Sequence, residues 1–160
     1  LSEISANEIM TPRTVIEHLG ADETVSAFVG SRDTFPVSRY IVTGENIDDV
    51  KGFVLTRELF LAGLRDGKDK TVSDYTRDIQ RVPETTDLDT LFDLLMESEA
   101  HIALVEDEYG GTAGLVTRED VIETLLGTEI VDENDEVEDL QKVARTRAIL
   151  RRDARKTSAK

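Results

Sequence analysis

Hydrophobic positions along the chain recur in two rhythms, and the same order of rhythms occurs twice. Short runs of β-branched and other apolar residues are typical of strands, whereas longer runs place apolar residues three and four positions apart, as on one face of a helix. The clearest helix, Asp87–Glu99, carries Leu88, Leu91, Leu94 and Leu95 on one side. The pattern therefore predicts a mixed α/β chain.

The first half predicts a strand–helix–strand–strand–helix order behind a short leading helix. That helix, within Ser5–Arg13, stops at Pro12 because the residue before a proline is pushed out of the helical region. The expected elements that follow are a strand at Thr14–Leu19, a helix at Asp22–Ser31, strands at Thr34–Tyr40 and Val50–Leu55, and a helix at Thr56–Leu64.

The second half repeats this order. Its expected elements are a strand at Ile79–Val82, the helix at Asp87–Glu99, strands at His101–Val105 and Ala113–Val116, and a helix at Arg118–Leu126. Gly52 and Gly114 hold matching places in the two halves, as do Phe28 and Leu94. Because a unit of this size cannot bury its own sheet, the two β-α-β-β-α units are expected to pack on each other with pseudo-two-fold symmetry.

These patterns divide the chain into three parts. The first repeat is expected over residues 1–67, the second over 68–133, and an acidic linker with a basic C-terminal helix or tail over 134–160. We expect the tail to be helical to about Arg152 and disordered beyond it. It either pairs with acidic surface elsewhere or forms a solvated end that frays.

Composition narrows the possible partners. The net charge of −15 argues against nucleic acid, whose phosphates need positive charge. There is no cysteine, and no apolar run approaches the roughly 18 residues of a membrane span. The chain begins at Leu1 without a signal-like segment, so we expect it to be a piece of a longer protein.

The sequence offers little for catalysis or metal binding. Its two histidines, His18 and His101, lie in strand-like stretches without a motif, so structural roles are expected and no catalytic residue is predicted. The acidic block Asp132–Glu138 lacks the glycine and the glutamate of a calcium loop, so no metal site is predicted. A phosphate-ester hydrolase would need a general base, and Glu119 is the only extra carboxylate near the candidate site.

That candidate site is the strand-to-helix junction Gly114-x-x-Thr117-x-x-Asp120. Thr117 and Asp120 match a capping box, which is a common helix start. A carboxylate at this place can also accept both hydroxyls of a ribose, while the threonine and the helix N-terminus face a phosphate.

The matching frame in the first half reads Gly52-x-x-Leu55-x-x-Glu58, which loses the hydroxyl. An inserted residue would align Thr56 with Thr117 but would place Leu59 against Asp120. On either alignment the second frame is intact and the first is degenerate. A second glycine-rich element, Tyr109–Thr112, fits a hairpin turn or a phosphate cradle, and the turn is the simpler interpretation.

These strings together resemble a known family. Ile9-Met10-Thr11-Pro12-Arg13, Phe35-Pro36-Val37, and above all the long string from His101 to Asp120 are similar to a tandem pair of cystathionine-β-synthase (CBS) domains, the Bateman module. More narrowly, they resemble the cytosolic part of the CorC/cyclin-M family of hemolysin-like proteins associated with magnesium and cobalt efflux. The resemblance covers Glu8 to about Asp135.

The resemblance implies a regulatory module and no enzyme. It implies binding of ATP or AMP, with Mg²⁺ possible alongside ATP, in the cleft between the repeats. It also implies a homodimer through the CBS helices, a transmembrane domain before Leu1, and a place at the cytoplasmic face of the cell membrane. The alternative is a dimerisation or interaction scaffold whose nucleotide site is vestigial.

The implied nucleotide site joins the two halves. Thr117 and Asp120 would hold phosphate and ribose, and Thr11 with Arg13, from the linker of the first repeat, would close the same site. Ile102 and Ala103 would flank the base. Gly114 and Arg118 complete the predicted set.

Overall fold

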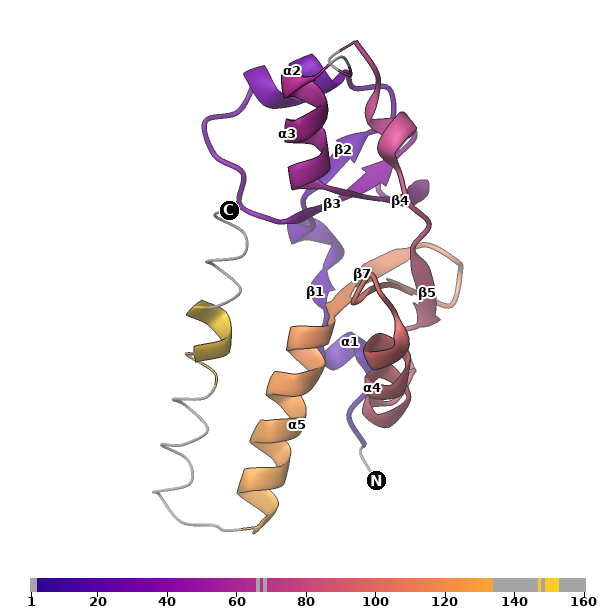
Figure 1. Cartoon of the computed structure of the whole chain (residues 1–160). Coiled ribbons are helices and arrows are strands. Elements are labelled where there is room, and N and C mark those ends of the chain that lie inside the picture. Colours follow the sequence, from indigo (N-terminus) through magenta and orange to yellow (C-terminus); the bar gives the residue numbers. More distant parts are fainter. Residues whose placement is uncertain (1–2, 66, 68, 134–146, 148, 153–160) are drawn as a thin grey trace.

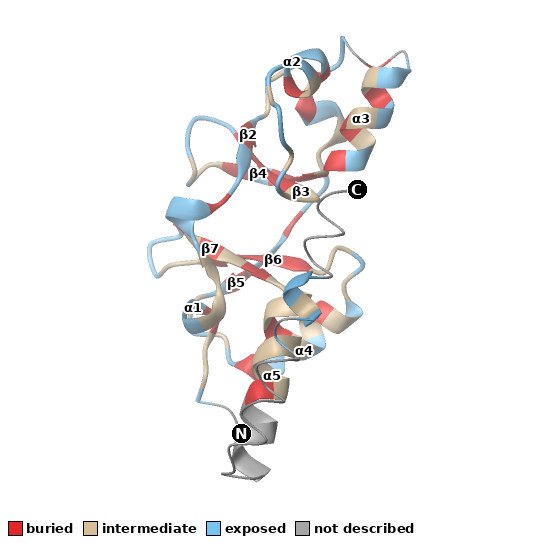
Figure 2. Ribbon diagram, turned by 90° about the vertical axis from the view of Figure 1, so that its left-hand side faces the viewer, coloured by how far each residue is buried: buried red, intermediate tan, exposed pale blue. Residues whose placement is uncertain are grey.

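The computed structural model describes residues 3–65, 67, 69–133, 147 and 149–152, which form two stacked lobes (Figure 1). Each lobe has one small sheet with helices on its outer side, so the layers run helix, sheet, sheet, helix (Figure 2). This α/β arrangement with β-α-β-β-α order in both halves confirms the predicted fold class. Among the described residues, no helix combines the length and the apolar character that a membrane span requires.

The first lobe is built on a three-stranded sheet in the order β2-β3-β4, with β3 parallel to β2 and antiparallel to β4. Its elements are β2 (His18–Gly20), α2 (Val25–Gly30), β3 (Arg39–Thr43), β4 (Val50–Leu55), α3 (Thr56–Leu64) and the 3-10 helix η2 (Val72–Tyr75). The Thr24 side chain starts α2 by accepting a bond from Ala27 N–H at 3.1 Å, which satisfies one unpaired amide of the first turn.

The second lobe has a four-stranded sheet in the order β1-β7-β6-β5. Its elements are α1 (Ala6–Ile9), β1 (Thr11–Pro12), β5 (Gln80–Pro83), α4 (Leu88–Glu97), β6 (Ile102–Glu106), β7 (Thr112–Thr117) and α5 (Arg118–Glu133). The apolar stripe predicted on α4 is confirmed, because Leu88, Leu91 and Leu95 are all buried. Asp87 caps α4 by accepting from Thr90 N–H at 2.8 Å.

The two lobes exchange their leading segments. The first, with α1 and β1, precedes the first repeat in sequence but adds β1 to the sheet of the second lobe. The second, around η2, lies on the first lobe, where Arg77 bridges to Phe53 of β4. Between β1 and β2 the chain crosses from the second lobe to the first through the 3-10 helix η1 (Arg13–Val15). This exchange ties the repeats together through the backbone.

Both leading segments begin with the same local device. Ser5 and Glu8 form a capping box at the start of α1, and Thr71 and Asp74 form one at the start of η2. Since these boxes occupy matching places in the two lobes, the internal repeat extends to the leading segments themselves.

Two glycines allow the exchanged segments to approach the sheets. A Cβ added at Gly114 would collide with the Thr11 carbonyl and with the Met10 side chain, and one added at Gly52 would collide with the Arg77 carbonyl. The matching Gly52 and Gly114 seen in the sequence are therefore explained by packing of backbone on backbone.

A separate apolar cluster joins the two sheets. It contains Ile16, Ile41, Val50 and Phe53 from the first half and Ile79, Ile102 and Leu104 from the second, all buried. Burying each such side chain contributes about 1.5–3 kcal/mol relative to leaving it exposed. The lobes are therefore held by one shared core in addition to the core inside each lobe.

Two strand predictions are wrong, both in the first half. The strand expected at Thr34–Tyr40 lies at Arg39–Thr43, because Pro36 has no N–H for a ladder and Phe35 instead packs on Phe60 with ring centroids 4.5 Å apart. The strand expected at Thr14–Leu19 is reduced to His18–Gly20, since the chain there is crossing between lobes.

The other predictions for elements of the chain have mixed outcomes. The strand Val50–Leu55 and the helix Thr56–Leu64 are confirmed residue for residue. The acidic linker and most of the predicted tail lie outside the described residues. Of the described tail positions, Arg147 and Arg151 each lie within ion-pair distance of Glu123 on α5, at 3.8 and 3.5 Å. Pairing with acidic surface, one of the two expected outcomes, is thus observed for these two arginines.

Replacing Gly114 with alanine tests the exchange of segments. We expect Gly114→Ala to lower the free energy of unfolding by about 1–3 kcal/mol, as overpacking does, because the new methyl group would push β1 off β7. Urea unfolding measures the change. Gly20→Ala is the matched control, because a Cβ there has nothing within 4 Å. Equal stability of the two variants would contradict the packing role of Gly114.

Candidate functional site

The strand-to-helix junction at the end of β7 forms the capping box that its sequence predicts. Asp120 N–H donates to Thr117 Oγ1 at 3.2 Å, and Thr117 N–H donates to Asp120 Oδ2 at 3.0 Å. The two bonds satisfy donors at the start of α5 and lock both side chains in one geometry. The junction is therefore fixed by bonds between its own residues.

Asp120 has an electrostatic environment that suits a binding group. Burial raises the pKa of its carboxyl above the ordinary value, and the nearby Glu119 and Glu123 act in the same direction. The two bonds from Thr117 oppose this rise in pKa without cancelling it. Burial keeps water away from the Asp120 carboxylate, and hydrogen-bond donors of a ligand can replace that solvation.

Three of the predicted residues share the sheet face that looks toward the first lobe. Thr117 lies directly opposite Ile102 in the β6–β7 ladder, and Thr11 lies opposite Leu115 on the other side of β7. Ile102 belongs to the core between the lobes and is 2% exposed. The structure thus places Thr11, Ile102 and Thr117 on one face of the sheet.

Ala103 and Gly114 are placed differently. Ala103 is fully buried in the cluster beneath the helices of the second lobe, on the opposite face of the sheet from Ile102. In this arrangement it presents no surface to the cleft. Gly114 has no side chain and so lets β1 approach β7, which explains the need for glycine at this position without a ligand.

Arg118 is held by the residue that begins the preceding hairpin. Its amide donates to the His101 carbonyl at 2.9 Å, and its Nη1 lies 3.1 Å from His101 Nε2. Because a guanidinium only donates, Nε2 accepts and the ring proton lies on Nδ1, which faces the Leu95 carbonyl at 3.5 Å. His101 adopts a φ of 59°, unusual for a residue with a side chain. Its structural role agrees with the sequence analysis.

Arg39 is a candidate site residue that the sequence analysis missed. It begins β3 in the first lobe, and its electrostatic neighbours include Arg118 and Glu119 of the second lobe as well as Arg57. Its Nε is buried and has no hydrogen-bond partner among the described residues. Burial lowers its pKa, and the two arginines add to this effect while Glu119 opposes it. Positive charge from both lobes therefore meets near the start of α5.

The misplaced strand explains why Arg39 was missed. The prediction treated Arg39 as the end of a strand around Pro36, whereas it begins the next stretch, opposite Leu55 at the start of α3. An available signal was the unbroken apolar run Tyr40–Val42 that follows it, which is typical of a buried strand.

The matching frame in the first lobe is engaged internally. Leu55 occupies the N-cap position of α3 and makes no side-chain cap, and Glu58 is ion-paired with Arg77 of the exchanged segment. Helix α3 begins at Thr56 as α5 begins at Arg118, so Glu58 takes the place of Asp120 and the alignment with an inserted residue is not needed. The prediction that the first site is degenerate fits this geometry and stays a prediction.

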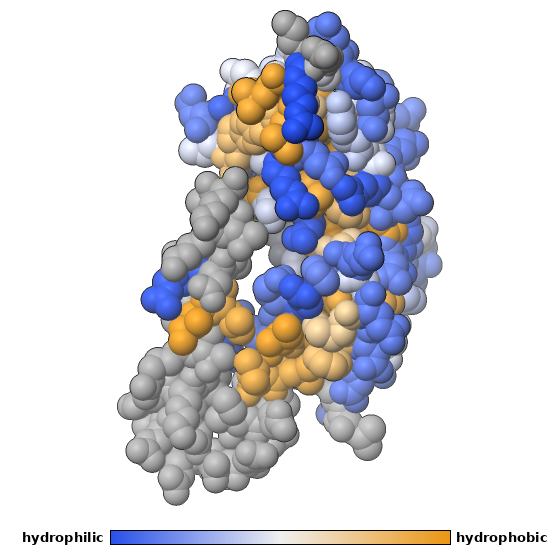
Figure 3. All heavy atoms as spheres, in the orientation of Figure 1, coloured by the Kyte–Doolittle hydropathy of each residue, from blue (hydrophilic) through white to orange (hydrophobic). Residues whose placement is uncertain are grey.

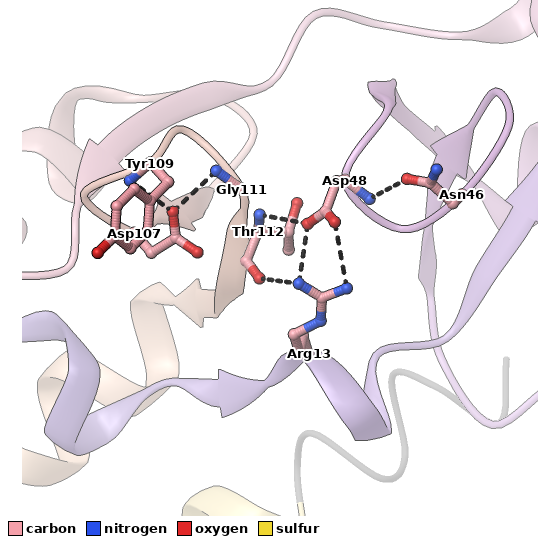
Figure 4. Close-up of polar contacts among 7 residues, drawn as sticks. All are labelled: Arg13, Asn46, Asp48, Asp107, Tyr109, Gly111 and Thr112. Carbon is pink, nitrogen blue, oxygen red and sulfur yellow. Dashed lines mark hydrogen bonds and ion pairs between the residues drawn. The ribbon is translucent and has the colours of Figure 1, made fainter.

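Arg13 contacts the end of β7 opposite to Thr117, beside Asp48 and Thr112 (Figure 4). Its Nη1 donates to Asp48 Oδ1 at 2.9 Å and to the Thr112 carbonyl at 3.3 Å, while Nη2 donates to Asp48 Oδ2 at 3.3 Å. Thr112 N–H also donates to Asp48 Oδ1, at 2.9 Å. We call Arg13, Asp48 and Thr112 the Arg13 clasp. Thr112 and Thr117 are five residue steps apart along the strand, or about 16 Å.

Other features of the described chain offer no competing centre. No group of three or more histidine, aspartate or glutamate side chains there is arranged to hold a metal ion. A surface pocket of about 470 Å³ lies beside α4, away from the junction, and is lined by Gln80, Thr90, Asp93, Leu94, Glu97 and Ser98.

Comparison with known proteins agrees with this architecture. A family model described as "CBS domain" matches residues 72–127. Among solved structures, the CBS domain of a bacterial CNNM/CorC family Mg²⁺ transporter in complex with ATP is 34% identical, with a TM-score of 0.72, covering 78% of this chain and 89% of that one. The CBS domain of a putative transporter from Clostridium difficile 630 is 32% identical, with a TM-score of 0.71, covering 79% and 96%. A CBS-domain pair from Klebsiella pneumoniae with bound AMP is 27% identical, with a TM-score of 0.67, covering 76% and 98%.

Curated relatives are longer than this chain. The UPF0053 protein sll1254 of Synechocystis is 38% identical over 145 residues, which are 91% of this chain and 42% of the relative. The UPF0053 protein YhdP of Bacillus subtilis is 35% identical over 91% of this chain and 33% of its own length. The chain thus spans less than half of these relatives. The paired lobes and the solved structures that match them together show that the chain belongs to the CBS-domain pairs of the hemolysin-like UPF0053/CNNM/CorC family of Mg²⁺ transporters.

Proposed function

We propose that this chain is a regulatory module that binds ATP or AMP, with Mg²⁺ accompanying ATP, in the cleft between its lobes. The observation that carries the proposal is the Thr117–Asp120 box, whose carboxylate is poorly solvated and lies at the start of α5, where Arg39 of the first lobe is within electrostatic reach of Arg118 and Glu119. Similarity to CBS domains solved with ATP and with AMP supports the choice of ligand. The chain contributes no chemical step.

Each group at the junction has a role in this proposal. Asp120 accepts the ribose hydroxyls, and the start of α5 with Thr117 and Arg118 faces the phosphates. Arg39 approaches the same phosphates from the first lobe. Ile102 and Thr11 line the cleft beside the nucleoside. A ligand touching both lobes binds one relative arrangement of them better than others, and only that difference in affinity can bias an attached domain.

The setting of the module follows from its family. We propose that it lies on the cytoplasmic face of the membrane, attached to the transmembrane part of a transporter of Mg²⁺ or cobalt, and that it dimerises through its helices. On the face shown in Figure 3, hydrophobic side chains gather in patches over the helices of both lobes. Leu61 and Leu64 of α3, 45% and 83% exposed, fit such a contact.

The alternative is a scaffold that dimerises the transporter and binds no nucleotide. The specific observation in its favour is that Thr117 and Asp120 already satisfy each other, as in an ordinary helix cap. The exposed leucines of α3 fit this alternative equally well.

Removing Mg²⁺ should weaken ATP binding. A polyphosphate meets a chain of net charge −15, and Mg²⁺ offsets part of the repulsion that Arg39 and Arg118 leave. Calorimetric titration with ATP and AMP, with and without Mg²⁺, is expected to show a loss of at least about tenfold in ATP affinity on chelation, or 1.4 kcal/mol. Equal ATP affinity with and without Mg²⁺ would contradict this prediction.

Changing Asp120 separates the sensor from the scaffold. Asp120→Ala and Asp120→Asn are both expected to lose nucleotide binding while folding and dimerising as the parent does. The asparagine variant can still accept from Thr117 N–H, so it keeps most of the cap that alanine loses at about 1 kcal/mol. Asp89→Ala, in the exposed first turn of α4, is the matched control. A parent chain that binds neither ATP nor AMP would favour the scaffold.

The raised pKa of Asp120 predicts a pH dependence of stability without ligand. Between the ordinary pKa of 3.8 and the raised value, the native state binds more protons than the unfolded state, so stability falls as pH rises through this window. Asp120→Asn lacks this penalty. Urea unfolding from pH 4 to pH 7 should therefore show the variant gaining stability relative to the parent as pH rises. A constant difference across the range would contradict the burial of the charge.

A further inference from the structure

Among the described residues, arginine side chains form hydrogen bonds between the lobes at one end of the contact and form none at the other end. At the first end lies the Arg13 clasp, in which one guanidinium reaches both oxygens of Asp48 and the Thr112 carbonyl. Asp48 belongs to the β3–β4 loop of the first lobe and Thr112 begins β7 of the second. The clasp therefore spans the two lobes directly.

Two further observations show that the clasp is built into the fold. Gly111, beside Thr112, has no side chain where a Cβ would meet Asp48 Oδ1 at 3.1 Å, so the carboxylate can approach the backbone. The Thr112 amide and Arg13 together hold the pKa of Asp48 below its ordinary value. A second arginine, Arg81 of β5, reaches across to the Val50 carbonyl at 2.7 Å.

At the other end, where α5 begins, charges of both signs meet across the lobes. Glu119 of the second lobe is the strongest charged neighbour of Arg39 and attracts it, while Arg118 of the second lobe and Arg57 of the first repel it more weakly. No hydrogen bond or ion pair joins Arg39 to the second lobe among the described residues. This end is held by the shared apolar core.

We propose that Arg13 and Asp48 are positioning residues that form a fixed hinge between the lobes, and that Arg13 is not a nucleotide ligand. The inference rests on the proposed function and reassigns one residue of its site. Because the hinge holds the far end of β7, a ligand at Thr117–Asp120 closes the lobes around it by binding Arg39 of one lobe and Arg118 of the other. Loss of the hinge lowers the fraction of molecules with lobes at the binding distance, which lowers the apparent affinity for every nucleotide alike.

This role and a phosphate-binding role for Arg13 predict opposite results. If Arg13 bound phosphate, its loss would weaken ATP far more than AMP, and Asp48→Asn would free it and strengthen ATP binding. If Arg13 and Asp48 form a hinge, Arg13→Met weakens ATP and AMP by the same factor, and Asp48→Asn weakens both as well. The direction of the change in ATP affinity in Asp48→Asn therefore distinguishes the two roles.

The experiment is a double-mutant cycle in nucleotide affinity. We expect Arg13→Met and Asp48→Asn each to reduce affinity for ATP and for AMP about fivefold, at the low end of coupling between sites, and the double variant to be no weaker than either. Arg13→Lys should keep only part of the affinity that Arg13→Met loses, because an ammonium cannot bind the carboxylate through two parallel bonds. Asp49→Asn is the matched control, since Asp49 lies on the same loop, loses the same charge, and pairs locally with Lys51 at 3.1 Å.

Three outcomes would overturn the hinge. The first is an Arg13→Met defect at least tenfold larger for ATP than for AMP, and the second is stronger ATP binding in Asp48→Asn than in Asp49→Asn. The third concerns hydrogen exchange without ligand. Arg13→Met should speed exchange of the buried Thr112 amide, although the acceptor of that amide, Asp48, is unchanged. Unchanged exchange rejects the hinge even if the parent binds no nucleotide, so the proposal and the nucleotide function fail separately.

Discussion

The fold depends on the apolar contact between two sheets that neither repeat could cover alone. Each sheet has helices on one face only, and the other face consists of side chains such as Ile41, Phe53, Ile102 and Leu104 that water would otherwise reach. Stacking the sheets buries both faces at once, and exchange of the leading segments makes the stacking intramolecular.

The site occupies the edge where the sheet of the second lobe ends and α5 begins. Here β7 supplies Thr117, and the first turn of the helix supplies Asp120. The opposite lobe contributes Arg39 only because the sheets are stacked. A strongly acidic protein, with a net charge of −15, thus places an arginine from each lobe beside Glu119 at this junction.

The sequence predicts local devices better than relations between the lobes. The capping box at Thr117, the α4 stripe and the β4–α3 unit follow from short-range rules, and the structure agrees with all of them. Arg77 and Asp48 gain their partners only through the exchanged segment and the contact between the lobes, and Arg39 meets the charges of the second lobe only there, so no spacing rule indicated them. The strand misplaced around Pro36 shows the same limit, since Phe35 is apolar for packing on Phe60 and not for a ladder.

The divergence of the two halves also follows from the exchange of segments. Arg77 and Thr11 hold matching places, one on β4 and the other on β7. The longer, charged side chain of Arg77 reaches Glu58 and neutralises the carboxylate that would otherwise correspond to Asp120. Thr11 has no such reach, and among the described residues no ion pair forms to Asp120, whose carboxylate bonds to Thr117. A single residue in the exchanged segment thereby decides which of two nearly equivalent junctions keeps its carboxylate out of an ion pair.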